Sequence, residues 1–135
     1  MPRILAVDFG ERRIGLATCD QTGQVVTARQ TLARASDARA AREIARFCTD
    51  EEVEAVVLGI PRSPGGVESS FANRVRSFGA KLSRELPVPV DYHEETLTSW
   101  EAQRAMPSGT KEEIDRQAAA ILLLDYLNHK KGDRR

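Results

Sequence analysis

Three strand-like apolar runs follow one another in the first 32 residues with very little chain between them. The runs span residues 3–9, 14–19 and 25–32, and the links at 10–13 and 20–24 each contain a glycine. Links this short join antiparallel neighbours, because a parallel connection needs a dozen residues or more. The chain is therefore expected to begin with a three-stranded antiparallel sheet.

The rest of the chain alternates between helix and strand patterns. Residues 36–48 and 71–82 carry apolar side chains at helical spacing, 53–59 is a continuous apolar strand, and 87–92 is a short strand. Two possible capping boxes, Thr98-x-x-Glu101 and Thr110-x-x-Glu113, predict helices from about residue 99 and from 111 to about 129. This order predicts an α/β fold with a mixed five-stranded sheet, three antiparallel strands then parallel crossovers, flanked by helices. It is typical of ribonuclease H-like proteins.

Length and composition limit the kind of protein this is. The chain of 135 residues fits a single domain, 1–135, and the final segment, about 130–135, is expected to be a flexible basic tail. Hydrophobic residues make up 41% and charged residues 30%, with a net charge of zero. We find neither an apolar run of membrane-spanning length nor a signal peptide, so we expect a cytoplasmic protein without a membrane partner.

Carboxylates stand at positions where the predicted fold would bring them together. Asp8 lies near the end of the predicted central strand, and Asp115 shares a helix face with Ala118, Ala119 and Leu122. Glu94 and Glu95 follow a parallel strand, and only one of these neighbours can face Asp8. Each position also has a structural interpretation, such as a turn cap, an acidic first helical turn or a solvated turn. Together they suit hard-oxygen binding of Mg²⁺ or Mn²⁺, one or two ions, as in phosphodiester cleavage.

Three blocks of the sequence also resemble a known family. They are LAVDFGERRIGLATCD at 5–20, HEETLTSWEA at 93–102 and IDRQAAAILLLDYL at 114–127. They resemble the Asp-x-Gly-x-(Lys/Arg)-Arg-Ile-Gly opening, the Asp-Glu-Arg-Leu-Thr-Thr block and the Ile-Asp-x-x-Ala-Ala ending of the RuvX (YqgF) family of ribonuclease H-like proteins. Members are described as Holliday junction resolvases and as nucleases that mature the small-subunit ribosomal RNA precursor.

The resemblance implies roles for particular residues. The family's acidic triad falls on Asp8, Glu95 and Asp115, which would be both catalytic residues and metal ligands. Arg13 matches an arginine expected to contact phosphate, and its neighbour Arg12 joins it as a nucleic-acid-binding candidate. The chain departs from the pattern at Glu94, which replaces an Asp, at Thr96, which replaces an Arg, and in the loop PRSPGG at 61–66. Arg62 of that loop is a further candidate for phosphate binding.

Several functions remain open at this point. The first is a metal-dependent nuclease that processes the 5′ end of pre-16S rRNA, with RNA as the preferred partner and single-stranded or branched DNA as alternatives. The second is a Holliday junction resolvase or other DNA-repair nuclease, which would act as a two-fold dimer. The third is a non-catalytic nucleic-acid-binding or scaffold protein. An actin-like or sugar-kinase ATPase would need a second lobe, for which the chain is too short. We expect a monomer or weak homodimer.

Overall fold

The computed structural model describes residues 3–62, 64–95 and 111–133. In chain order its elements are β1 (Ile4–Phe9), β2 (Arg13–Cys19), β3 (Val26–Ala33), α1 (Asp37–Asp50), β4 (Ala55–Pro61), η1 (Pro64–Gly66), α2 (Ser70–Glu85), β5 (Val90–Glu95) and α4 (Lys111–Asp133). The helix predicted from about residue 99 and both predicted capping threonines, at positions 98 and 110, lie outside the described residues.

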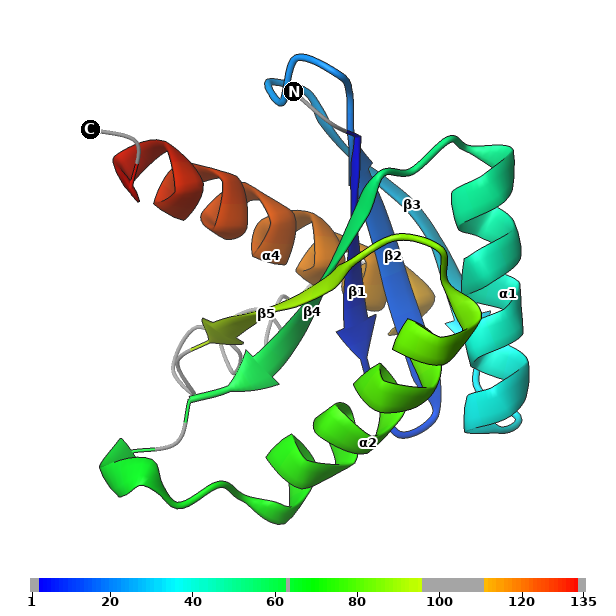
Figure 1. The fold of residues 1–135 in the computed structure, drawn as a ribbon, viewed down its shortest axis with the longest axis vertical. Coiled ribbons are helices and arrows are strands. Elements are labelled where there is room, and N and C mark those ends of the chain that lie inside the picture. Colours follow the sequence, from blue (N-terminus) through cyan, green and yellow to red (C-terminus); the bar gives the residue numbers. More distant parts are fainter. Residues whose placement is uncertain (1–2, 63, 96–110, 134–135) are drawn as a thin grey trace.

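The strands form one five-stranded sheet in the order β3-β2-β1-β4-β5. The pairs β1–β2 and β2–β3 are antiparallel, whereas β1–β4 and β4–β5 are parallel. Helices α1 and α2 cover one face of the sheet and α4 covers the other (Figure 1). The predicted mixed sheet, with its central first strand, is confirmed.

Alternation along β1 divides the core into two layers. Leu5, Val7 and Phe9 pack toward α1 and α2, whereas Ile4 and Ala6 pack toward α4. Successive side chains of a strand point to opposite faces. Asp8, the next even-numbered residue of β1, is therefore on the α4 face.

Serine side chains cap both helices of the α1–α2 layer. The Ser36 hydroxyl accepts a hydrogen bond from the Arg39 amide at 3.2 Å, and the Ser69 hydroxyl accepts one from the Ala72 amide at 3.1 Å. Each cap satisfies an amide that the first helical turn leaves without an intrahelical partner. Ser36, predicted as the first helical residue, is thus the N-cap, and α1 begins at Asp37.

Strands β4 and β5 both run further than the sequence predicted. Their parallel pairing continues through Ile60↔Glu94 and Pro61↔Glu95, beyond the predicted strand ends at residues 59 and 92. The Arg62 amide then donates a hydrogen bond to the Glu95 carbonyl at 2.8 Å. Glu95 is therefore a strand residue, and the prediction that it comes just after the strand is wrong.

Helix α4 also ends later than predicted. It extends to Asp133 rather than to about residue 129, and residues 134 and 135 lie outside the described part. The flexible basic tail stays a prediction. Lys130 places its ammonium nitrogen 5.4 Å from the centroid of the Tyr126 ring, and a cation near a helix C-terminus also interacts favourably with the helix dipole. None of the helices in the described ranges is long and apolar enough to cross a membrane.

Candidate functional site: buried carboxylates at one edge of the sheet

Asp8 occupies the central strand near its C-terminal end. It is 4% exposed and pairs directly with Gly15 of β2. Directly opposed residues of an antiparallel pair present their side chains to the same face of the sheet. The absent side chain of Gly15 therefore leaves space beside Asp8 on the α4 face.

The backbone of α4 fills the space at Gly15. A Cβ atom on Gly15 would lie 2.0 Å from the carbonyl oxygen of Asp115, closer than any real contact. Only glycine permits this approach, and it brings the first turns of α4 onto β2. Asp115 is 3% exposed, on the sheet-facing side that its apolar neighbours predicted.

Glu95 reaches the same face from β5. A Cβ atom on Gly59 of β4 would lie 2.9 Å from Glu95 Oε2 and 3.1 Å from the Leu122 side chain of α4. Leu58 of β4 is the register partner of Val7 of β1. The next residue of β4, Gly59, therefore lies beside Asp8 in the sheet. The carboxylate of Glu95 therefore extends over Gly59 toward α4, and Glu95 is 9% exposed.

Glu94 lies on the opposite face of β5. It is exposed, and its charge acts on Arg76 of α2. The strand alternation that separates the two glutamates is the one expected from the sequence. The structure therefore places Glu95, and not Glu94, on the face that carries Asp8 and Asp115.

Arg13 contacts one of these carboxylates directly. Its Nε donates to Asp115 Oδ2 at 2.6 Å, and the two side chains are 28% and 4% exposed. Arg13 is two residues before Gly15 on β2, so it shares the α4 face. A buried carboxylate needs a counter-charge or hydrogen-bond donors, and Arg13 supplies both to Asp115.

The two other arginines predicted to bind nucleic acid flank the same edge. Arg12 is exposed in the turn between β1 and β2, and its carbonyl accepts a hydrogen bond from the Arg34 amide at 2.9 Å. Arg62 is exposed just after β4, and its amide is bonded to the Glu95 carbonyl. Arg12 thus lies just after the end of β1, which carries Asp8, and Arg62 lies beside the end of β5, which carries Glu95.

The three carboxylates have the donor chemistry of a hard-cation site. Asp8, Glu95 and Asp115 come from β1, β5 and α4, and all three are buried. Within the described residues, however, no group of three or more acidic, histidine or cysteine side chains is arranged to hold a metal ion. The carboxylates fit Mg²⁺ or Mn²⁺ by chemistry and burial, but they are not preassembled as a ligand set.

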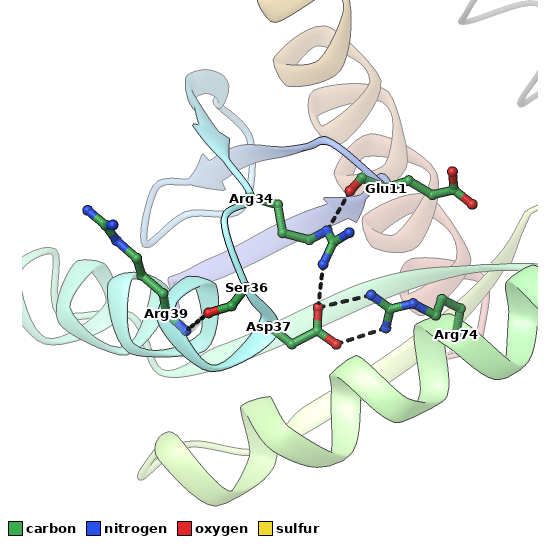
Figure 2. Close-up of polar contacts among 6 residues, drawn as sticks. All are labelled: Glu11, Arg34, Ser36, Asp37, Arg39 and Arg74. Carbon is green, nitrogen blue, oxygen red and sulfur yellow. Dashed lines mark hydrogen bonds and ion pairs between the residues drawn. The ribbon is translucent and has the colours of Figure 1, made fainter.

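A fourth buried carboxylate, which we did not predict, lies on the other side of the sheet. Asp37 accepts hydrogen bonds from Arg34 at 2.9 Å and from Arg74 at 2.8 and 3.1 Å (Figure 2). We call these three residues the Asp37 cluster. Arg34, at the end of β3, is three residues from Asp37, but Arg74 reaches it from α2, 37 positions away in the chain.

Acid should weaken the contribution of Asp37 to stability. The hydrogen bond from Arg74 and the charges of Arg74 and Arg34 hold the pKa of Asp37 below its ordinary value of 3.8. The contribution is complete above that value and is lost as the pH falls through the lower pKa of the folded state. In urea unfolding, Asp37→Asn should be less stable than the wild type at pH 7, and the gap should narrow below about pH 4. A gap that stays constant in acid would contradict this account.

The comparisons with known proteins agree with this fold. Residues 2–129 match the family model described as "RuvX: Holliday junction resolvase". A relative from Trichormus variabilis named "Putative pre-16S rRNA nuclease" is 35% identical over 92% of this chain and 86% of its own length. One of the same name from Synechococcus elongatus is 36% identical over 97% of this chain and 92% of its own.

Solved structures show the same architecture. The RuvC of T. thermophilus, solved in complex with a Holliday junction substrate, has a TM-score of 0.62 at 12% identity and covers 98% of this chain and 97% of its own. The fowlpox virus Holliday junction resolvase has a TM-score of 0.53 at 15% identity over 94% and 99% of the two chains. These likenesses confirm the ribonuclease H-like fold, and together with the family match they show that this chain belongs to the RuvX family.

Proposed function

We propose that this protein is a divalent-metal-dependent nuclease that hydrolyses phosphodiester bonds in the 5′-end processing of pre-16S rRNA. The observation that carries the proposal is the burial of Asp8, Glu95 and Asp115, from three separate elements, on one face and at one edge of the sheet. Burying carboxylates is costly, so a function that needs them there explains why they are kept. The chemistry that Mg²⁺ or Mn²⁺ would supply when held there is activation of a water molecule and stabilisation of the leaving oxygen.

In this proposal, acidic residues bind the cation and arginines bind the substrate. Asp8, Glu95 and Asp115 would supply the oxygen ligands. Arg13 would hold Asp115 in its orientation through the Nε contact, while its partial exposure leaves further N–H groups for a phosphate. Arg12 and Arg62, both exposed beside the strand ends, would bind the flanking backbone phosphates.

RNA is the substrate that the relatives favour, since those aligned over nearly the whole chain carry a pre-16S rRNA name. Cleavage of a four-way junction is the second candidate, favoured by the description of the family model. Symmetric junction cleavage requires a two-fold dimer. The large exposed hydrophobic residues of the described ranges, Val25, Val67 and Leu124, lie on three separate segments. We therefore propose a cytoplasmic monomer or weak homodimer that acts on RNA.

A side-by-side cleavage assay tests this function. The substrates are an RNA spanning the 5′ end of 16S rRNA, a single-stranded DNA of the same sequence and a four-way DNA junction, each with Mg²⁺, Mn²⁺ or EDTA. We expect metal-dependent cleavage that is fastest on the RNA. Cleavage of the junction alone would establish the resolvase instead, and binding without cleavage of any substrate would establish a non-catalytic protein.

The arginines should differ in how they affect RNA binding. A plot of log affinity against log salt concentration has a negative slope. Arg12→Ala should make that slope shallower by about 0.7, the value for one phosphate contact to a single strand. Arg13→Ala should make the slope similarly shallower and also slow cleavage, because it removes the partner of Asp115. The control is Arg42→Ala, which removes an exposed arginine from α1 on the other side of the sheet. An Arg13→Ala slope equal to that of the wild type would make Arg13 purely structural.

A further inference from the structure

Arg34 connects the Asp37 cluster to the turn between β1 and β2, residues 10–12. Its Nε donates to the Glu11 carbonyl at 2.6 Å, and its backbone amide donates to the Arg12 carbonyl at 2.9 Å. The same guanidinium donates from Nη1 to Asp37, so one side chain bridges the turn and the start of α1 (Figure 2). The turn is therefore attached at two successive carbonyls.

Asp37 determines where Arg34 can lie. Its carboxylate is 9% exposed, and it accepts hydrogen bonds from Arg34 and from both terminal nitrogens of Arg74. Hydrogen bonds between ionised groups are shorter and stronger than neutral ones, and the guanidinium fork fixes their direction. Asp37 thus fixes Arg34 between the start of α1 and the β1–β2 turn, which places its Nε at the turn.

The cluster also packs against the strand that carries Asp8. The guanidinium carbons of Arg34 and Arg74 lie 5.8 and 5.2 Å from the centroid of the Phe9 ring. Phe9 ends β1, is 1% exposed and directly follows Asp8, on the opposite face of the strand. The Asp37 cluster therefore holds both the last residue of β1 and the turn beyond it.

We propose that Asp37 is a positioning residue for nucleic-acid binding, which acts through Arg34 to hold the β1–β2 turn and its exposed Arg12 in place for a phosphate. The inference rests on the proposed function, because it assigns the turn a nucleic acid to bind. Asp37 itself touches neither the substrate nor the catalytic carboxylates. Because Asp37 holds the turn in place before the phosphate binds, it lowers the entropic cost of binding.

The test compares two variants of the cluster with a matched surface variant. Asp37→Asn removes the charge that orients Arg34, and Arg34→Lys retains the charge of Arg34 but lacks its fork of donors. The control, Glu43→Gln, removes a negative charge from the same helix at the exposed pair with Arg39. The dissociation constant of a single-stranded RNA is measured with Ca²⁺, and amide hydrogen exchange is measured without RNA.

We expect Asp37→Asn and Arg34→Lys to raise the dissociation constant about tenfold, the equivalent of one charge-assisted hydrogen bond, against about twofold or less for Glu43→Gln. Asp37→Glu should restore part of the loss. Exchange should accelerate at the Arg34 amide, which is bonded to the Arg12 carbonyl, but not at the Val53 amide, which is bonded to the Cys48 carbonyl. Faster exchange at both amides would indicate general loosening and would overturn the inference.

The possible failures can be told apart. If the wild type binds RNA and both cluster variants bind it as well as Glu43→Gln does, the inference fails and the proposed function stands. Tighter binding by Asp37→Asn than by Glu43→Gln would also overturn it, since Asp37 would then be withholding two arginines from the RNA. If the wild type does not bind RNA, the proposed function fails and the positioning role fails with it. If Asp37→Asn does not fold, Arg34→Lys decides.

Discussion

Asp8→Asn should abolish RNA cleavage while the protein remains folded. The change retains the shape of a buried side chain at the centre of the sheet and removes one of the three charges proposed to hold the metal. We expect the rate of cleavage to fall by about three orders of magnitude, which corresponds to about 4 kcal/mol of lost transition-state stabilisation. The midpoint of urea unfolding should stay the same or rise, because repulsion from Glu95 and Asp115 decreases.

The matched control for Asp8→Asn is Asp50→Asn. Asp50 is an exposed residue at the end of α1, so the same chemical change there should leave cleavage at the wild-type level. Cleavage by Asp8→Asn at the rate of the control, at an unchanged unfolding midpoint, would show that Asp8 is a structural carboxylate. A lower midpoint together with lost activity would point to a folding defect.

Gly15→Ala should destabilise the protein and displace α4. The added methyl group would lie 2.0 Å from the Asp115 carbonyl oxygen and 2.4 Å from its carbonyl carbon, and both are backbone atoms that cannot rotate away. Forcing extra volume into a packed interface typically costs about 1–3 kcal/mol, and we expect the upper end of that range or more here. Cleavage should decrease as well, since moving the start of α4 moves Asp115.

Gly65→Ala provides the comparison for Gly15→Ala. A Cβ atom at Gly65 would meet nothing within 4 Å, so that substitution introduces only the strain of a residue at φ +76°, about 1–2 kcal/mol. Urea unfolding of the two variants measures the difference. Ordinary surface substitutions change the free energy of unfolding by about 0.5 kcal/mol or less. If Gly15→Ala differs from the wild type by no more than this, the position of α4 does not depend on the glycine.

Most of the fold could be predicted from local patterns in the sequence. Short links required the antiparallel start, and the apolar run of β4 indicated a strand buried on both faces. The strand ends could not be predicted, because PRSPGG reads as a loop from Pro61 and HEE as a polar turn. Pairing between β4 and β5 overrides both signals and extends the strands to Pro61 and Glu95.

The candidate site was predictable only in part. Helical spacing predicted that Asp115 would be buried, and strand alternation indicated that one of Glu94 and Glu95 would face away from Asp8. The contact of Arg13 with Asp115 was not predictable, because it joins residues 102 positions apart in the chain. The same holds for Asp37, whose partner Arg74 lies 37 positions away on another helix.

A manganese titration of three proteins, the wild type and two variants, tests whether carboxylates of this face hold a divalent cation. A ligand that binds only the folded state raises the unfolding midpoint, and the rise increases with the logarithm of the ratio of ligand concentration to dissociation constant. Thermal unfolding with and without Mn²⁺ therefore reports binding without any substrate. Glu95→Gln and Glu94→Gln make the same change at adjacent residues on opposite faces of β5. We expect Mn²⁺ to raise the unfolding midpoints of the wild type and Glu94→Gln equally and that of Glu95→Gln much less. An equal rise in both variants, or no rise in the wild type, would contradict this expectation.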